Sequence, residues 1–162
     1  MLKLVQQKKR LSRMTDRVYP IVIVLVRLLW RILGLRFTIK GEDRVPRTGG
    51  AILAINHVGY LDFAISGTAA LPAKRYVRYM AKKQIFENKI AGPLMRGMHH
   101  ISVDRNSGSA SFVAALRALK AGEIVGIFPE ATISKSFEIK ALKSGAARLA
   151  IGADVPVLPT IV

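Results

Sequence analysis

The chain has 162 residues, no cysteine and a formal charge of +16, from 26 Lys and Arg against 10 Asp and Glu. Its length suits one folded domain, because domains mostly have on the order of 100 to 150 residues. The lack of cysteine excludes disulfide frameworks, cysteine-ligated zinc and thiol nucleophiles, so a cytoplasmic setting is the default. The charge predicts an anionic partner and leaves nucleic acid, an acidic lipid surface and a small phosphorylated substrate open.

The amino-terminal part of the chain is first basic and then apolar. Residues 1–17 carry six Lys and Arg against Asp16 alone, and an apolar run begins at Pro20. A cleaved signal peptide is disfavoured, because Arg27 and Arg31 interrupt the apolar run and no small-residue cleavage site follows. The same arginines disfavour a bilayer-spanning helix, which needs about 20 apolar residues.

We therefore predict that residues 1–35 form an amphipathic, membrane-associating helical segment that lies at the interface. Its arginines would reach lipid phosphates while its apolar side chains enter the acyl boundary, with Trp30 as an interfacial anchor. The side chains predicted to enter are Val24, Leu25, Leu28, Trp30 and Leu35. A helix packed into the core of the same chain is the alternative.

Residues 36–162 alternate short apolar runs with helical patterns. This alternation predicts an α/β domain with a central, mostly parallel sheet flanked by helices. The strands are predicted at 36–40, 51–55, 76–80, 98–103, 123–128 and 156–162, and helices at 110–120 and 143–151. The pair His99 and His100 then falls in a strand, without metal-ligand spacing, so no metal is predicted. Because the chain stops inside an apolar strand-like segment, we expect the natural protein to continue beyond Val162.

The segment Asn56-His-Val-Gly-Tyr-Leu-Asp62 directly follows the apolar run 51–55. Open α/β sheets bind ligands at this position, outside the carboxyl ends of their strands. His57 and Asp62 do not share a helix face, but a turn at Gly59 would return the carboxylate to the imidazole. A carboxylate on one ring nitrogen makes the other a better base toward a substrate hydroxyl. Alone, such a pair is more often structural than catalytic.

Three further segments strengthen the functional interpretation: Gly97-Met-His-His-Ile-Ser-Val-Asp-Arg105, Phe128-Pro-Glu-Ala-Thr132 and Val155-Pro-Val-Leu-Pro159. With them, the chain from about residue 36 to its end resembles the lysophosphatidic acid acyltransferases of the glycerolipid acyltransferase superfamily. The four motifs occur in the family's order. The resemblance implies an enzyme on the cytoplasmic face of the cell membrane that moves a fatty acyl group from acyl-CoA or acyl carrier protein to lysophosphatidic acid. The product would be phosphatidic acid, and no cofactor is implied.

The resemblance also implies roles for particular residues. His57 matches the general base and Asp62 the carboxylate that orients it. The implied substrate-binding residues are Arg105, Glu130, Thr132, Lys82 and Lys135. Arg105 suits a phosphate because a guanidinium binds it in a bidentate way, although pairing with Asp104 is the alternative.

The third motif departs from the family at two positions. Glycine is usual where this chain has Ala131, and arginine is frequent where it has Ile133, so Lys135 would supply the displaced charge. Glu130 matches a glutamate with which the family positions the acceptor, and its structural alternative is a cap on the following helix.

The implied reaction is direct acyl transfer without an acyl-enzyme, with a backbone N–H near the first or third motif as oxyanion donor. Glycerol 3-phosphate or another phosphorylated polyol lipid is an alternative acceptor. A catalytically idle lipid-binding protein and a nucleic-acid-binding module are more distant alternatives. In the last of these, Tyr76 and Tyr79 would stack on bases, but His57, Asp62 and Glu130 would have no role. We therefore predict no nucleic-acid partner.

Overall fold

The structure is a computed structural model that describes residues 16–104, 108–136 and 138–162. It contains two compact units. The helical unit comprises Met1–Phe37 and Gln84–His100, and the sheet unit comprises Thr38–Lys83 and Ile101–Val162. The helical unit therefore combines the predicted amino-terminal segment with a segment from further along the chain.

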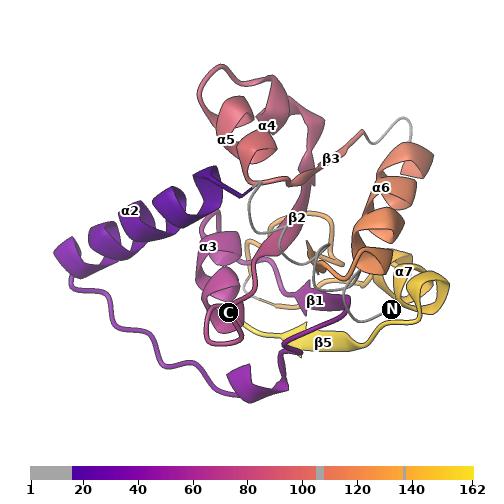
Figure 1. Cartoon of the computed structure of the whole chain (residues 1–162), viewed down its shortest axis with the longest axis horizontal. Coiled ribbons are helices and arrows are strands. Elements are labelled where there is room, and N and C mark those ends of the chain that lie inside the picture. The colour runs from indigo at the N-terminus through magenta and orange to yellow at the C-terminus, as the bar shows by residue number, and fades with distance from the viewer. Residues whose placement is uncertain (1–15, 105–107, 137) are drawn as a thin grey trace, which may run out of the picture. The chain divides into compact units, whose positions relative to one another are not determined.

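The sheet unit is built on five parallel strands in the order β3-β2-β4-β1-β5 (Figure 1). The strands are β1 (Ala51–Ile55), β2 (Val77–Lys82), β3 (Ile101–Val103), β4 (Ile124–Ile127) and β5 (Val157–Thr160). The central pair is in register with Leu53 opposite Gly126. The predicted α/β class with a parallel sheet is confirmed. β1 has the predicted bounds, whereas β3, β4 and β5 are shorter than their apolar runs suggested.

Helices and turns cover both faces of the sheet, which explains why its strands are continuous apolar runs rather than alternating ones. On one face, Ile52 and Val125 pack with α6 (Gly108–Lys120) and α7 (Gly145–Ala153), which lie side by side in Figure 1. On the other, Leu53, Ile55 and Tyr79 pack near the short helices that follow β1. Those short helices are α3 (Asp62–Gly67) and the 3-10 helix η2 (Thr68–Ala70), and a second 3-10 helix, η1, spans Glu42–Arg44.

One predicted strand segment is wrong, and another is correct only in its second half, where β3 lies. Residues 36–40 have no regular secondary structure, because the sheet ends in β3 and β5 and this segment pairs with neither. His99 and His100 lie in the turn between α5 (Ala91–Gly97) and β3. Their N–H groups donate to carbonyls of the last turn of α5, and His99 has a left-handed φ of 56°, so this segment ends a helix.

Two basic residues of the sheet unit stabilise its interior. Arg78 is buried and pairs with Glu123 at 3.3 Å. Arg75 donates to the carbonyls of Pro46, Gly49 and Gly122, and so joins the loop before β1 to the turn before β4. Burial lowers the pKa of Arg75, and the carboxylate of Glu123 partly offsets that effect. Part of the positive charge therefore serves the fold rather than a partner.

The helical unit contains α2 (Val18–Ile32), α5 and the end of α4 (Lys83–Glu87). The start of α2 lies so close to α5 that a Cβ on Gly97 would be 2.6 Å from a methyl of Val18. Trp30 is buried and its ring lies 4.6 Å from that of Phe37, so its prediction as an exposed interfacial anchor is wrong. The side of α2 with Trp30 packs within the unit, while another apolar side is exposed. Within the described ranges, no helix has both the length and the apolarity to cross a bilayer.

Candidate active site

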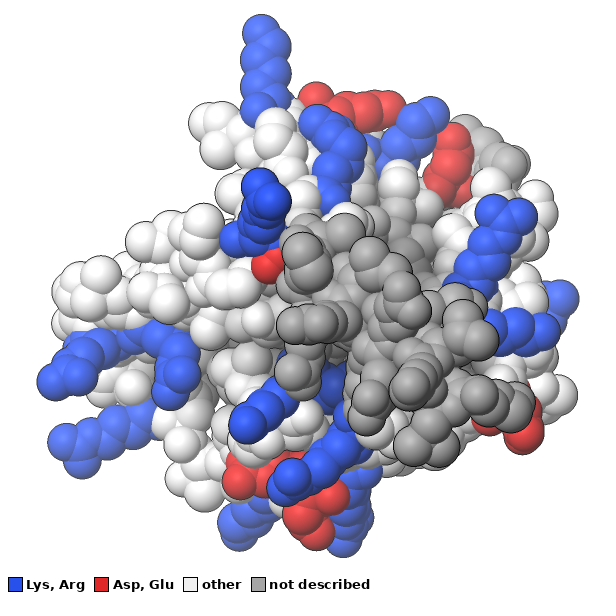
Figure 2. Space-filling view, viewed as in Figure 1, with Lys and Arg blue, Asp and Glu red and all other residues white. Residues whose placement is uncertain are grey.

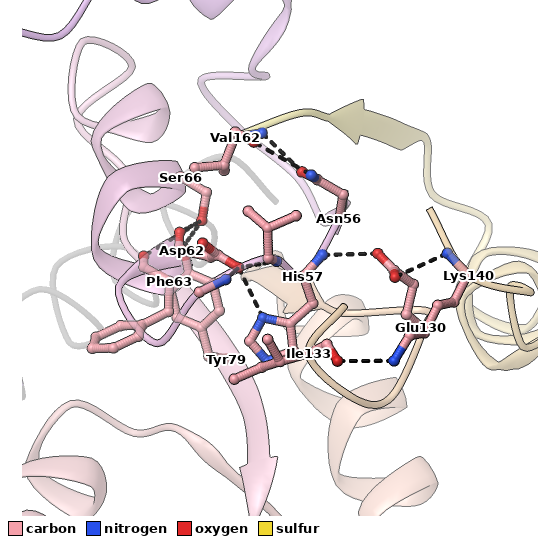
Figure 3. Close-up of polar contacts among 12 residues, drawn as sticks. Asn56, His57, Asp62, Phe63, Ser66, Tyr79, Glu130, Ile133, Lys140 and Val162 are labelled. Carbon is pink, nitrogen blue, oxygen red and sulfur yellow. Dashed lines mark hydrogen bonds and ion pairs between the residues drawn. The ribbon is translucent and has the colours of Figure 1, made fainter. Parts of the chain in front are cut away.

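The first and third motifs meet at the carboxyl end of the sheet, because β1 and β4 are parallel neighbours. His57 follows β1 and Glu130 follows β4. The His57 N–H donates to Oε1 of Glu130 at 2.8 Å (Figure 3). Residues 73 positions apart in sequence are therefore in direct contact.

Asp62 begins α3, and one of its oxygens binds three donors. Oδ2 accepts from Nδ1 of His57 and from the N–H groups of Val58 and Gly59, each at 2.8 Å. The predicted turn at Gly59 is present, and a Cβ there would lie 3.3 Å from Oδ1 of Asp62. Asp62 is only 3% exposed, so solvent does not compete for these bonds.

This contact determines which ring nitrogen of His57 can act as a base. A carboxylate oxygen accepts hydrogen bonds, so Nδ1 carries a hydrogen, and in the neutral imidazole Nε2 then has the lone pair. The His57 side chain is 20% exposed, against 4% for that of Asp62. The arrangement therefore leaves Nε2 as the nitrogen that can act as a base and buries the group that orients the ring.

Aromatic rings support the imidazole. Phe128 stacks on His57 with ring centroids 4.2 Å apart, and Tyr79 lies behind Phe128 at 6.2 Å. Gly126 leaves room for the Tyr79 ring, because a Cβ there would be 2.5 Å from a ring carbon. The Tyr79 hydroxyl lies 2.9 Å from Oγ of Ser66, which donates to the Asp62 carbonyl at 2.6 Å. Packing and hydrogen bonds thus connect β2 and α3 to the His57–Asp62 pair.

The loop that follows β4 contacts the first and third motifs through its described residues Ser134 and Lys140. The Ser134 N–H donates to the His57 carbonyl at 2.6 Å, and the Lys140 N–H donates to Oε2 of Glu130 at 3.0 Å. Ala131, where the resemblance places glycine, has a left-handed φ of 58°. Glu130 is not a helix cap, because its carboxylate accepts from main-chain groups of His57 and this loop.

The structure brings together His57, Asp62 and Glu130 of the predicted site residues. Thr132 and Lys135 are exposed on the loop after β4, and Lys82 is exposed at the end of β2. Arg105 lies outside the described residues. Its alternative partner Asp104 is 3.2 Å from Nζ of Lys83. No group of three or more His, Asp and Glu side chains suited to a metal occurs in the described part of the chain.

Sequence reasoning missed several residues that support the site: Asn56, Ser66, Tyr79, Phe128, Ser134 and Lys140. Ser66 stands four positions after Asp62, a helical spacing that predicts the observed bond to the Asp62 carbonyl. Asn56 exchanges two hydrogen bonds with the backbone of Val162, at 2.8 and 3.3 Å, and so joins β1 to the segment after β5. No local sequence pattern predicts the contact between Asn56 and Val162.

Comparisons with known proteins agree with this geometry. The sequence model of the Acyltransferase family matches residues 36–162, and the chain belongs to this family. It is 37% identical over 131 residues to the 1-acyl-sn-glycerol-3-phosphate acyltransferase of Bacillus subtilis (strain 168), which covers 79% of the chain and 64% of that protein. Identity is 27% over 132 residues with the human 1-acyl-sn-glycerol-3-phosphate acyltransferase beta, covering 79% of the chain and 46% of that protein.

A solved structure has the same fold. The 1-acyl-sn-glycerophosphate acyltransferase PlsC from Thermotoga maritima superposes with a TM-score of 0.65 at 18% identity, covering 95% of this chain and 58% of that one. The chain therefore spans about half to two thirds of the length of these proteins. The resemblance drawn from the four motifs is confirmed.

Proposed function

We propose that the chain catalyses transfer of a fatty acyl group from a thioester donor to the free hydroxyl of lysophosphatidic acid, giving phosphatidic acid. The observation that carries the proposal is the buried Asp62 carboxylate bound to Nδ1 of His57, whose side chain is itself partly exposed. The names of the Bacillus subtilis and human relatives support this choice of acceptor.

In the proposed reaction, Nε2 of His57 removes the acceptor hydroxyl proton as that oxygen attacks the thioester carbonyl. Asp62 stabilises the imidazolium that forms. The tetrahedral intermediate then expels the thiolate, which takes the proton from His57 and leaves the ester. A backbone N–H near the first or third motif would stabilise the oxyanion. No acyl-enzyme forms.

Basic side chains around the carboxyl end of the sheet would bind the acceptor phosphate. We propose this role for Arg105, Lys82, Lys135 and the hydroxyl of Thr132. Acyl-CoA is the proposed donor and acyl carrier protein the alternative, since both present a thioester.

We also propose that α2 lies on an anionic membrane surface at the cytoplasmic face. Its exposed apolar stripe, with 51 to 72% of each side chain accessible, consists of Ile21, Val24, Leu25, Leu28, Leu29 and Ile32. Arg27 and Arg31 are exposed on the same helix and would bind lipid phosphates. A helix in the interface would bring the protein to its lipid acceptor without crossing the bilayer.

The structure weakens the nucleic-acid alternative. Tyr79, one of its two stacking residues, is buried against Phe128. Arg78, beside it, pairs with Glu123 inside the sheet unit. Figure 2 shows Lys and Arg scattered over the visible face rather than gathered in one stripe. A groove that follows a nucleic-acid backbone needs such gathered charge.

The experiment that tests the function is release of free thiol from palmitoyl-CoA with and without lysophosphatidic acid. We expect release that depends on the acceptor and falls by about 10²- to 10⁴-fold in His57→Ala. Glycerol 3-phosphate in place of lysophosphatidic acid tests the alternative acceptor, and palmitoyl acyl carrier protein the alternative donor. Equal transfer by folded His57→Ala would contradict the mechanism, and no transfer with any combination would contradict the function.

A further inference from the structure

We propose that Glu130 is a positioning residue that fixes the backbone of His57 and does not bind the acceptor. This inference rests on the proposed function, because it concerns the same site. It departs from the role that the family resemblance implies for this glutamate.

The first step concerns the hydrogen bonds of the carboxylate. Glu130 is 4% exposed, and each of its oxygens accepts from a main-chain N–H. Oε1 binds the His57 N–H at 2.8 Å, and Oε2 binds the Lys140 N–H at 3.0 Å. A carboxylate and a phosphate both only accept hydrogen bonds. Glu130 is therefore poorly suited to bind the acceptor phosphate. Its two oxygens already connect His57 to the loop that contains Lys140.

The second step concerns the peptide groups on either side of the His57 Cα. The N–H of His57 is bound by Glu130, and its carbonyl is bound by the Ser134 N–H at 2.6 Å. Ser134 is 2% exposed, so both contacts are shielded from water. The first bond has a carboxylate as its acceptor and is therefore stronger than a bond between neutral groups. The main chain at His57 is thus held from both directions.

The third step connects backbone position to reaction rate. Asp62 and Phe128 fix the plane of the imidazole, and the main-chain contacts of His57 help to fix the position of its Cα. A displacement of about 1 Å in a reacting group can cost roughly 10²-fold in rate. Loss of the Glu130 contact should therefore lower kcat. It should leave the KM for the acceptor unchanged, because no acceptor contact is lost.

The direct test is Glu130→Gln. Glutamine keeps one carbonyl oxygen but turns an NH2 group toward the other main-chain N–H, so one of the two contacts is lost. We expect kcat to fall by about 10- to 100-fold, with the acceptor KM within about two-fold of wild type. The matched control is Lys135→Ala, which removes a proposed phosphate contact and should raise the acceptor KM. A rise in acceptor KM at unchanged kcat in Glu130→Gln would overturn the inference.

A second pair of variants tests the contact without changing the carboxylate. Lys140→Pro removes the N–H that binds Oε2, whereas Lys140→Ala keeps this N–H and also loses the side-chain bond from Nζ to the Ile133 carbonyl. We expect kcat of Lys140→Pro to be several-fold below that of Lys140→Ala at equal acceptor KM. Equal kcat in the two variants would count against the inference, and this comparison decides the matter if Glu130→Gln does not fold.

A measurement that needs no activity separates this inference from the proposed function. Hydrogen exchange of the His57 amide, followed by NMR, should be at least ten-fold faster in Glu130→Ala, which removes both contacts, than in wild type, while exchange in β1 changes little. An unchanged rate would overturn the inference. A protected His57 amide in a protein that transfers no acyl group would support the contact and reject the proposed function.

Discussion

The carboxyl end of the sheet buries charged side chains, whereas the exposed side of α2 leaves apolar side chains accessible. At the sheet, the charged side chains of Asp62 and Glu130 are 3% and 4% exposed, and hydrogen bonds hold both of them. On α2, the apolar side chains of Leu25 and Ile32 are 59% and 72% exposed. Burial of a charge needs specific partners, whereas an exposed apolar stripe needs only an apolar environment to cover it. We therefore expect the first region to carry the chemistry and the second to contact an apolar surface.

If the two regions have these separate roles, substitutions at the carboxyl end of the sheet alter kcat and do not change membrane binding. The largest effect is expected from Asp62→Asn. An asparagine can present its amide NH2 to Nδ1 of His57 and so favour the tautomer whose Nε2 carries the hydrogen. We expect kcat to fall by about 10³- to 10⁴-fold, measured as acceptor-dependent thiol release. Binding to anionic vesicles should equal that of wild type, and a parallel loss of vesicle binding would contradict these separate roles.

The reciprocal change is made on α2. Replacing both Leu25 and Leu28 with Glu places two negative charges on the exposed stripe and removes apolar area worth about 1.5 to 3 kcal/mol per side chain. We expect binding to vesicles that contain phosphatidic acid, measured by co-sedimentation, to weaken by at least about ten-fold.

The control for this change is Val113→Glu, which adds the same charge to an exposed apolar position on α6. Its vesicle binding should fall much less than that of the α2 variant. Turnover of a short-chain acceptor that does not form membranes should be the same in both variants and in wild type. Loss of that turnover in the α2 variant alone would show that the helix contributes to the chemistry.

A smaller effect is expected from Phe128→Leu, which keeps an apolar side chain but removes the ring stacked 4.2 Å from His57. Without it, the imidazole can rotate about its bond to Cβ. We expect kcat to fall by about ten-fold, since such ring contacts contribute about 0.5 to 1.5 kcal/mol. The same substitution at Phe112 on α6, in the cluster on the other face of the sheet, is the control and should leave kcat near wild type. Equal losses of kcat in Phe128→Leu and Phe112→Leu would indicate a general loss of stability.

The two regions also differ in how far sequence alone predicted them. The His57–Asp62 pair and the turn at Gly59 are local, so residue spacing was enough to predict their contact. The meeting of the first and third motifs follows from a parallel sheet, since β1 and β4 end on the same side. The partners of Glu130 could not be predicted, because they are main-chain groups of His57 and Lys140 whose positions depend on the folded loop.

On α2, the apolar pattern predicted a helix but not which of its apolar sides is covered. Trp30 was predicted to be exposed because tryptophan is common at membrane interfaces, yet it packs on Phe37. The helical period identifies an apolar side only when the other sides are polar. Since α2 is apolar on more than one side, packing within its unit decided the outcome.

The smallest expected effect concerns the turn that directs Glu130 toward His57. Ala131 has a φ of 58°, a conformation that costs a residue with a Cβ roughly 1 to 2 kcal/mol and costs glycine little. Ala131→Gly should therefore raise the free energy of unfolding by up to about 1 kcal/mol, after the greater freedom of glycine in the unfolded chain is subtracted. Urea unfolding measures this free energy. The control is Gly122→Ala, which adds a Cβ at a φ of 87° and should lower the free energy of unfolding. A stability gain with unchanged kcat would mean that hydrogen bonds alone hold Glu130 in place. A gain accompanied by a lower kcat would mean that the stiffness of Ala131 helps to position His57, so that the carboxyl end of the sheet sacrifices stability for geometry.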